Sequence, residues 1–182
     1  MIGSSESGAG DVEMDLGARL VGAAVPALWL DSTVGPVSLA ELAGECLVLY
    51  LYPHATGLPD PPVPGWDSIP GARGCTAQSC AFRDRQNELE ALGARIFGLA
   101  AQTIDEQNMF AARIRLNYPL ISDPERRLAA LLGLPTFTAG GRTFYTRLTL
   151  IARKGLIAKA FYPVTEPELN AAEVAEWLRR TE

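Results

Sequence analysis

The sequence is poor in the residues that build metal and haem sites, with one histidine and three cysteines among 182 residues. A zinc site needs about four Cys, His or carboxylate ligands, so we expect neither a metal nor another cofactor. No stretch reaches the roughly 18 consecutive apolar residues of a membrane span. Residues 1–17 also lack the basic and apolar regions of a signal peptide. We therefore expect a cytoplasmic protein with no membrane partner.

Positive charge is also scarce, since 16 Lys and Arg stand against 21 Asp and Glu and give a net charge of -5. This balance argues against nucleic acid as the main partner. The Ser/Gly bias of residues 1–17 predicts a flexible lead-in. Residues 18–182, in a chain that is 48% apolar, are expected to form a single domain with one hydrophobic core.

Short apolar runs alternate with helix-forming runs. Residues 46–52, Cys-Leu-Val-Leu-Tyr-Leu-Tyr, are typical of a strand buried on both faces of a sheet. Residues 25–30 are expected to form a first strand or an extended arm. Further strands are predicted at 95–101, 119–121, 143–152 and 156–162, and helices at 39–43, 76–92, 103–115, 123–132 and 165–180. Helix starts are marked by Asp123 before Pro124, and by the capping pairs Ser38 and Glu41, Thr103 and Glu106, and Thr165 and Glu168. This order predicts an α/β fold with a central mixed sheet flanked by helices.

Residues 53–74 interrupt this alternation. Six of the thirteen prolines fall here, which excludes both a helix and the interior of a sheet. A loop of this length in a compact domain is usually functional or disordered. Trp66 within it indicates that part of the loop packs against the domain.

Two cysteines, Cys75 and Cys80, follow this loop where a helix is predicted to begin. A thiol in the first turn of a helix faces unpaired N–H groups and the positive end of the helix dipole. That environment favours the reactive thiolate form. Cys75 is therefore the candidate nucleophile, with Cys80 as its candidate disulfide partner.

The spacing of this pair constrains its chemistry. Residues five apart in an α-helix have Cα atoms roughly 8 to 9 Å apart, whereas a disulfide needs about 4.4 to 6.8 Å. Oxidation to a disulfide must therefore unwind the helix start. Such a pair is better suited to a catalytic cycle than to a structural disulfide.

Other cysteine chemistry fits less well. The C-x-x-C motif of a thioredoxin-type redox site is absent from the sequence. A Cys–His nucleophile would need His54 to approach Cys75 and be held by a third group. Two unreactive, packed thiols are the remaining alternative, and the glycine-flanked helix start argues against it. We expect Cys46 to be a buried, small apolar residue.

The string Leu49-Tyr-Leu-Tyr-Pro53 followed by Gly74-Cys-Thr-Ala-Gln-Ser-Cys-Ala-Phe-Arg-Asp84 resembles the peroxiredoxins. It is most similar to the bacterioferritin-comigratory (PrxQ) branch of the AhpC/TSA family, and the resemblance extends from about residue 20 to residue 178. It implies a thioredoxin-like fold, with Cys75 as the peroxidatic and Cys80 as the resolving cysteine. The arginine that stabilises the thiolate and the peroxide maps onto Arg147. Pro53, Gly74, Thr76 and Gln78 map onto the substrate pocket, with Gln78 at its entrance.

The chain departs from the family at one position. The family pattern P-x-x-x-T-x-x-C places a peroxide-binding threonine three residues before the reactive cysteine, where this chain has Ala72. Pro53-His54-Ala55-Thr56 carries a shortened version, separated from Cys75 by an insertion at residues 57–74. We expect Thr56 to supply the hydroxyl, with Ser68 as the alternative. Arg73 is either a second cation beside Cys75 or an exposed loop residue.

The resemblance implies a thiol-dependent peroxidase that reduces hydrogen peroxide or organic hydroperoxides and is recycled by thioredoxin or glutaredoxin. A monomer or weak dimer is expected. Two other classes remain open at this point. A general thiol–disulfide oxidoreductase would reduce disulfides without consuming peroxide, and a redox sensor would bind a partner in one oxidation state only, without turnover.

Overall fold

The computed structural model describes residues 16–182, so nearly all of the predicted lead-in lies outside the described residues. Seven strands form one sheet in the order β2-β1-β5-β4-β3-β8-β9. The central strand β3 pairs parallel with β4 and antiparallel with β8, so the sheet is mixed. The strands of this sheet are β1 (Trp29–Ser32), β2 (Val37–Ser38), β3 (Cys46–Leu51), β4 (Arg95–Ala100), β5 (Leu120–Ser122), β8 (Leu148–Arg153) and β9 (Leu156–Phe161).

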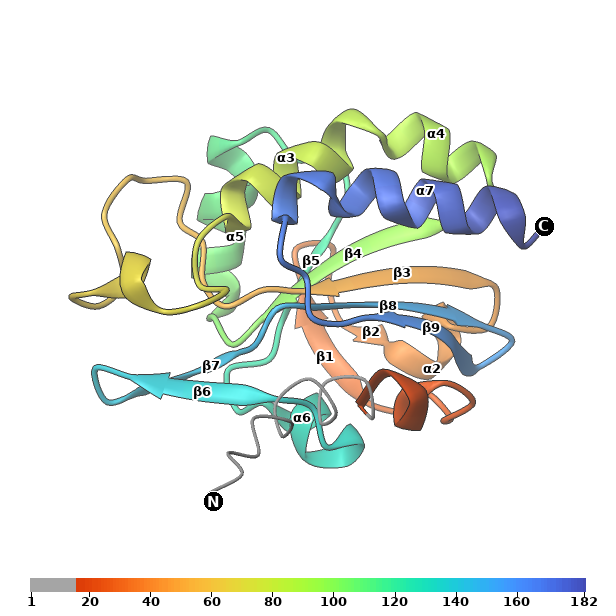
Figure 1. The fold of residues 1–182 in the computed structure, drawn as a ribbon, viewed down its shortest axis with the longest axis horizontal. Coiled ribbons are helices and arrows are strands. Elements are labelled where there is room, and N and C mark those ends of the chain that lie inside the picture. The colour runs from red at the N-terminus through yellow and green to blue at the C-terminus, as the bar shows by residue number, and fades with distance from the viewer. Residues whose placement is uncertain (1–15) are drawn as a thin grey trace, which may run out of the picture.

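Helices cover both faces of this sheet (Figure 1). One face carries α3 (Cys75–Asp84), α4 (Gln86–Ala91), α5 (Ile104–Arg113) and α7 (Asn170–Arg180). The other face carries α2 (Leu39–Leu42) and α6 (Arg127–Leu132). The predicted α/β fold with a central mixed sheet is confirmed. The described part of the chain contains no helix long and apolar enough to cross a membrane.

Strand β3 contributes side chains to two separate cores. Val48 and Tyr50 pack beneath α3, α4 and α7, while Leu47 and Leu49 face the opposite side. All four are buried, because side chains alternate between the two faces of a strand. The prediction of a strand buried on both faces is confirmed. The carboxyl end of this strand leads directly into residues 52–56, which precede the long proline-containing loop.

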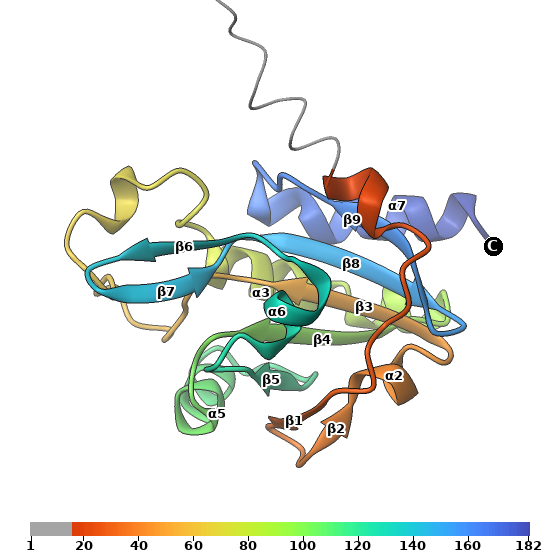
Figure 2. The same ribbon diagram turned by 90° about the horizontal axis from the view of Figure 1, so that it is seen from below.

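A second small sheet projects beside the main one. Strands β6 (Thr136–Ala139) and β7 (Arg142–Tyr145) pair antiparallel and form a ribbon. Residues 57–74, termed the proline-rich loop, extend over this ribbon (Figures 1 and 2). Trp66, in a short 3₁₀-helix η1 (Trp66–Ser68), lies 4.9 Å from Phe144 and 5.8 Å from Phe137 between ring centroids. The prediction that Trp66 packs down is confirmed.

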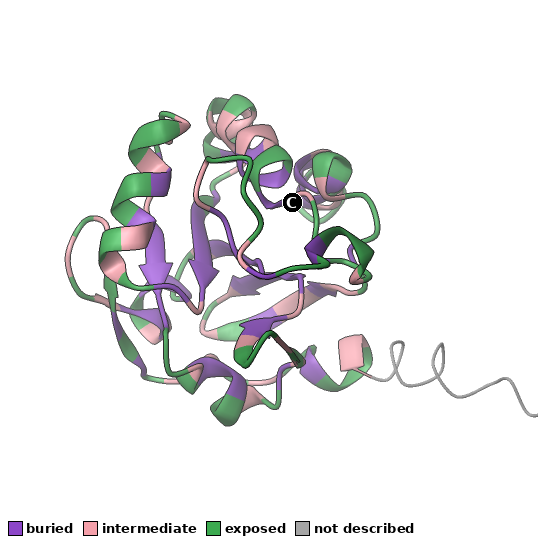
Figure 3. Ribbon diagram, turned by 90° about the vertical axis from the view of Figure 1, so that its left-hand side faces the viewer, coloured by how far each residue is buried: buried purple, intermediate pink, exposed green. Residues whose placement is uncertain are grey.

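The remaining surface of this loop is largely exposed (Figure 3). Its buried residues, Val63, Trp66 and Ala72, form a third core with Phe144. This third core contains no residue of the central sheet. The loop is therefore held by the β6–β7 ribbon.

Two strand predictions need correction. The ladder expected from residue 25 begins at Trp29, and the segment before it, interrupted by Pro26, makes only an isolated bridge between Ala24 and Leu156. The strand expected at 143–152 is two strands, because β7 pairs with β6 and the chain then crosses to β8. Thr146 and Arg147 form that crossing.

Three helix predictions also need correction. The helix expected at 76–92 begins at Cys75 and leaves helical geometry at Arg85, where φ is -104° and ψ is 8°. Asp123 is not the N-cap residue of α6, because this helix begins at Arg127 and Arg126 is its N-cap. Its carboxylate is held in the interior by the Tyr145 hydroxyl at 2.7 Å and accepts hydrogen bonds from the N–H groups of Arg127 and Leu128.

The last helix lacks its predicted cap. A 3₁₀ turn, η2 (Pro167–Leu169), precedes α7, and neither element has a side-chain cap. Thr165 and Glu168 therefore do not form the predicted pair. The capping box of Thr103 and Glu106 is present in full, and Ser38 accepts the N–H of Glu41.

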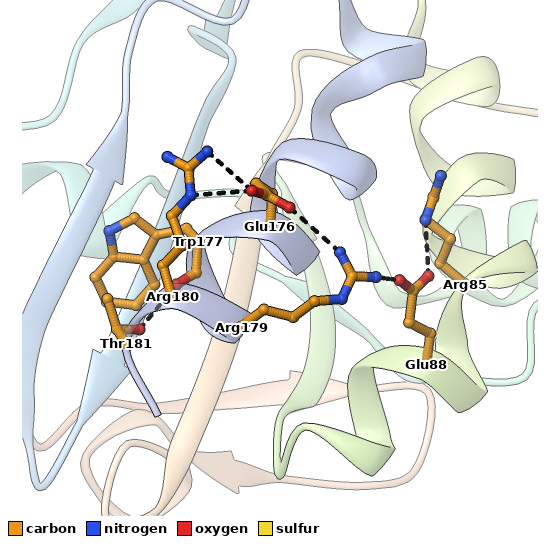
Figure 4. Close-up of polar contacts among 7 residues, drawn as sticks. All are labelled: Arg85, Glu88, Glu176, Trp177, Arg179, Arg180 and Thr181. Atoms are coloured by element: carbon orange, nitrogen blue, oxygen red, sulfur yellow. Dashed lines mark hydrogen bonds and ion pairs between the residues drawn. The ribbon is translucent and has the colours of Figure 1, made fainter.

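Charged side chains join α7 to α4 (Figure 4). Glu88 of α4 is contacted by Arg85 and by Arg179 of α7, and Arg179 also reaches Glu176. A network of this kind contributes more than an isolated surface pair. These ion pairs link α4 directly to α7, and no residue of α3 takes part in them.

Candidate active site

Helix α3 begins at Cys75, directly after the proline-rich loop. Gly74, the residue before it, has φ of 100°, a conformation that favours glycine. A Cβ at this position would also lie 2.8 Å from Cγ of Pro167. Cys75 follows in the first turn and is 3% exposed. The structure therefore places a buried thiol at the unpaired N–H groups of a helix start.

Arg147 lies beside this thiol. Its Nη2 donates to Cys75 Sγ at 3.2 Å and to the carbonyl of Arg73 at 2.8 Å. The arginine is 2% exposed, and in residues 16–182 no carboxylate pairs with it. A buried cation without an anionic partner is costly. In the described structure, the side-chain groups that accept hydrogen bonds from this guanidinium are Cys75 Sγ and the side-chain oxygen of Gln78.

A buried polar chain holds Arg147 in this orientation. Its Nη1 donates to the side-chain oxygen of Gln78 at 2.6 Å. Gln78 in turn donates to Oδ1 of Asn170 at 3.0 Å, and the Thr149 hydroxyl donates to the same oxygen at 2.6 Å. Gln78 is fully buried and does not line the pocket entrance as expected. Asn170 and Thr149 were missed, because nothing in the local sequence marks them.

Cys80 lies one and a half turns further along the same helix. Both cysteines are free and the helix is intact. The neighbouring Ser79 is fixed from below, since its hydroxyl accepts a hydrogen bond from Tyr50 at 2.9 Å and its carbonyl accepts one from Tyr118 at 2.7 Å. Burial raises the pKa of Tyr50, so the Tyr50 hydroxyl stays protonated and can donate this hydrogen bond. Any unwinding that brings Cys80 to Cys75 must disturb these contacts.

A pocket of about 210 Å³ opens above Cys75. Thr56, Gly74 and Thr76 line it, as the sequence predicts, together with residues of the proline-rich loop. Pro53 is buried and, in the described part of the chain, is not among the lining residues. Ser68 is exposed and faces a different hollow. Thr56 therefore has the better position for a pocket hydroxyl.

Arg73 also reaches this pocket, but its side chain is exposed. Its Nε lies 3.8 Å from Asp67, and both side chains are about three-quarters exposed. An exposed pair of this kind contributes little. The interpretation of Arg73 as a loop residue fits this position better than that of a second buried cation.

The chain segment between β3 and the proline-rich loop is fixed by side chains from α5 and the turn before it. Gln102 bonds both the N–H and the carbonyl of Ala55, at 3.0 and 2.9 Å. Arg113 donates to the Thr56 carbonyl at 2.8 Å. The Thr56 hydroxyl accepts the Leu58 N–H at 3.1 Å, and its own hydrogen is left for a ligand. The pocket wall next to Cys75 is thus preformed.

His54 and Cys75 line the same pocket, but they do not form a Cys–His catalytic pair of the kind considered above. Nδ1 of His54 is buried and has no hydrogen-bond partner in the described structure, so no third group orients the imidazole. Residues 16–182 also contain no group of three His, Cys, Asp or Glu side chains placed to hold a metal ion. The chemistry of the site is that of a thiol and an arginine.

A buried thiol at a helix start, hydrogen-bonded to an arginine that has no carboxylate partner in the described residues, is an arrangement typical of thiol-based redox centres. The profile of the AhpC/TSA family matches residues 68–160, slightly more than half of the chain. The chain belongs to the AhpC/TSA family.

Its relatives place it in the peroxiredoxin Q branch of that family, and the protein is an enzyme of the peroxiredoxin type. Chloroplastic peroxiredoxin Q from Sedum lineare is 27% identical over 79% of this chain and 69% of its own length. The protein from Gentiana triflora is 29% identical over 79% of this chain, which spans only 58% of that relative.

Solved structures agree with this placement. The peroxidoxin BcpB of Mycobacterium tuberculosis superposes with a TM-score of 0.72 and 25% identity, over 89% of this chain and 97% of that one. Peroxiredoxin Q of Xanthomonas campestris has a TM-score of 0.70 at 23% identity, over 89% of this chain and 98% of the other. The fold is thioredoxin-like.

Proposed function

We propose that this protein reduces hydroperoxides with Cys75 as the peroxidatic thiolate. The observation that carries this proposal is the buried guanidinium of Arg147, which has no carboxylate partner in residues 16–182 and lies 3.2 Å from Cys75 Sγ. A thiolate balances this charge, and a thiolate is the form that attacks an O–O bond. Arg147 is also close enough to polarise a peroxide bound at the sulfur.

The first step forms an S–O bond and breaks the O–O bond. Cys75 becomes a sulfenic acid, and the second oxygen leaves as water or an alcohol after it takes up a proton. The N–H groups at the start of α3 and the Arg147 guanidinium face the charge that develops on the two oxygens. The Thr56 hydroxyl, on the opposite wall of the pocket, is proposed as the further hydrogen-bond donor.

The second step joins Cys80 to Cys75. The Cys80 thiol attacks the sulfenic sulfur, a disulfide forms and water leaves. Because the two residues lie in one intact helix, α3 must unwind. Unwinding releases Gln78 from Arg147 and Asn170. The charged network between α4 and α7 supports the proposal that this unwinding ends at Arg85 (Figure 4).

The disulfide is then reduced by thiol exchange with a dithiol protein. We propose thioredoxin or glutaredoxin as this reductant, and a monomer or weak dimer as the working form. A thiol–disulfide oxidoreductase on the same fold would accept the same reductant without consuming peroxide. Peroxide consumption therefore separates the two activities.

Stopped-flow measurement of peroxide consumption tests the proposal on the wild type, Cys75→Ser and Cys80→Ser. Cys46→Ser is the matched control, since Cys46 is the first residue of β3 and lies at the opposite end of this strand from the pocket. We expect Cys75→Ser to abolish consumption and Cys80→Ser to stop after one sulfenic acid per chain. Mass spectrometry of the oxidised proteins should show the internal disulfide in the wild type and in Cys46→Ser, and in neither of the other two variants. Consumption at the wild-type rate by Cys75→Ser contradicts the proposal.

A further inference from the structure

Two buried tyrosines hold the part of α3 that lies between its two cysteines. The Tyr50 hydroxyl donates to Oγ of Ser79 at 2.9 Å, and the Tyr118 hydroxyl donates to the Ser79 carbonyl at 2.7 Å. The two tyrosine oxygens are 2.7 Å apart, within hydrogen-bonding distance of each other. We term these three hydroxyl groups the tyrosine clamp. Because Ser79 directly precedes Cys80, the clamp acts on the residue next to the proposed resolving thiol.

The tyrosine clamp lies in an apolar core. Tyr50 and Ser79 are fully buried, and Tyr118 is nearly so. Burial raises the pKa of both tyrosines, so their hydroxyls stay neutral and remain hydrogen-bond donors. Since solvent does not reach these groups, water can replace their hydrogen bonds only after α3 has moved away from the sheet. The clamp therefore opposes unwinding of the helix.

The sheet leaves room for the ring of Tyr50. Gly98 of β4 is the register partner of Tyr50, and a Cβ at this glycine would lie 2.8 Å from both Cζ and the hydroxyl oxygen of the tyrosine. The ring also stacks on Phe82 of α3, with the centroids 4.6 Å apart. Tyr50 is thus fixed by the sheet and contacts α3 at two residues, Ser79 and Phe82.

A different set of hydrogen bonds holds the start of the same helix, and its strength depends on the oxidation state of Cys75. Arg147 donates to Cys75 Sγ at 3.2 Å and to the side-chain oxygen of Gln78 at 2.6 Å. A charge-assisted hydrogen bond is roughly twice as strong as a neutral one, so the bond to sulfur weakens when a thiolate becomes a neutral sulfenic acid. The bonds of the tyrosine clamp join hydroxyl and carbonyl groups and involve neither cysteine side chain. They keep their strength after oxidation.

We propose that the tyrosine clamp sets the rate at which Cys80 reaches the oxidised Cys75, with Tyr118 and Ser79 as positioning residues of the resolving step. This inference rests on the proposed function and deepens it. Oxidation of Cys75 loosens the helix start at Arg147, and the clamp is the polar contact that must then break before α3 unwinds.

Two reactions compete for the sulfenic acid during this time. When Cys80 reaches it, the Cys80 sulfur attacks the Cys75 sulfur, an S–S bond forms, the S–O bond breaks, and the hydroxyl leaves as water with the thiol proton. While α3 stays folded, a second hydroperoxide can oxidise the same sulfur to a sulfinic acid and is itself reduced to water or an alcohol. The clamp therefore determines how much peroxide the enzyme tolerates before it is inactivated.

Two variants weaken the clamp. Tyr118→Phe removes one donor to Ser79 and leaves the ring in place. Ser79→Ala removes the acceptor of Tyr50, and because alanine is the strongest helix former, faster unwinding in this variant cannot come from a lower helix propensity. Tyr52→Phe is the matched control, since the Tyr52 hydroxyl is also buried but donates to Gln107 of α5 at 2.6 Å.

Single-turnover reactions with hydrogen peroxide are stopped with acid, and mass spectrometry counts the thiol, disulfide and sulfinic forms. We expect Tyr118→Phe and Ser79→Ala to form the Cys75–Cys80 disulfide about three- to tenfold faster than the wild type, the usual effect of one lost hydrogen bond. The peroxide concentration that converts half of the protein to sulfinic acid should rise by the same factor. Oxidation of the Cys75 thiol should stay within about twofold, because Arg147 is untouched. Tyr52→Phe should match the wild type in all three measurements.

An unchanged disulfide rate in Tyr118→Phe overturns the inference. An equal gain in Tyr52→Phe also overturns it, because a general loss of stability would then be what opens the helix. If Tyr118→Phe does not fold, the disulfide rate of Ser79→Ala decides by the same two criteria.

Hydrogen exchange in the reduced protein tests the clamp without peroxide. Amide exchange of residues 75–84 should become about three- to tenfold faster in Tyr118→Phe, while exchange in α5 stays as in the wild type. Unchanged exchange in α3 overturns the inference. A wild type that consumes no peroxide or forms no Cys75–Cys80 disulfide defeats the proposed function, and the exchange rates then still decide whether the clamp holds α3.

Discussion

The two sides of the Cys75 pocket are built in different ways. Beneath Cys75, behind the pocket lining, lies a chain of buried polar groups that runs from Arg147 through Gln78 to Asn170 and is termed the floor. The outer wall of the pocket, the proline-rich loop, is held by aromatic and aliphatic contacts with the β6–β7 ribbon. A polar network fixes both distance and direction, whereas apolar packing fixes position with less directional constraint. The hydrogen bonds of the floor are suited to holding the reacting groups in a fixed orientation. The apolar packing of the wall is suited to shaping the entrance through which a substrate reaches Cys75.

Removing the cation from the floor should have the largest effect. Arg147→Met is expected to lower the rate of Cys75 oxidation by peroxide about 10²- to 10³-fold, the usual cost of one lost transition-state donor. Arg147→Lys should recover only part of the rate, since an ammonium lacks the planar fork that reaches both Cys75 and Gln78. Stopped-flow oxidation of both variants checks this. A Met variant within about threefold of the wild type would show that the floor acts by packing alone.

Acidification should weaken the protein through His54, which lies on the segment that leads from β3 into the proline-rich loop. The pKa of His54 falls from its ordinary 6.5 to about 4 in the folded state, mainly through burial. Between these values the unfolded chain binds the proton and the folded chain does not, so stability decreases as pH falls from 6.5 toward 4. We expect a loss on the order of 2 to 3 kcal/mol from this group.

Urea denaturation of the wild type and His54→Asn across this pH range measures that contribution. Because the chain has one histidine, the difference between the two proteins isolates His54. If the free energy of unfolding changes with pH in the same way in both proteins, the imidazole is not held neutral by its surroundings.

Disturbing the contact between the proline-rich loop and the β6–β7 ribbon should have the smallest effect of the three changes. A Cβ at Gly140 would lie 2.6 Å from Cγ1 of Val63, whereas a Cβ at Gly141 meets nothing within 4 Å. Both glycines have positive φ, 57° and 74°, so alanine strains the backbone at either position. Gly140→Ala and Gly141→Ala are therefore a matched pair in which only the first displaces the proline-rich loop.

We expect Gly140→Ala to speed proteolysis and hydrogen exchange of residues 57–74, with a stability cost of about 1 kcal/mol beyond that of Gly141→Ala. Peroxide reduction should become faster for bulky organic hydroperoxides relative to hydrogen peroxide. Identical behaviour of the two variants would mean that Val63 does not anchor the loop.

Local sequence patterns predicted the parts of the molecule that depend on near neighbours. The apolar run at 46–52 became the central strand, and the Thr103 and Glu106 pair became a capping box. The helix start at Cys75 follows from Gly74 and the helix-forming run after it. Each of these features depends on contacts within about four residues or on simple alternation.

Predictions were wrong where a distant partner overrode the local preference. Asp123 was displaced from its N-cap position by its bond to Tyr145, and β7 was drawn away from β8 by pairing with β6. The lost cap of Thr165 and Glu168 has a local cause instead, the 3₁₀ turn that begins at Pro167 between them. Propensities of a few tenths of a kcal/mol per residue are easily outweighed by such contacts.

The sequence by itself determined a cysteine at a helix start, a second cysteine on the same helix and a proline-rich loop before them. Only the tertiary structure decided what surrounds the thiol. Arg147 is 72 residues from Cys75, and Asn170 is 92 residues from Gln78. Contacts over such separations form only when the sheet brings β8 and α7 beside α3, and no local pattern records them.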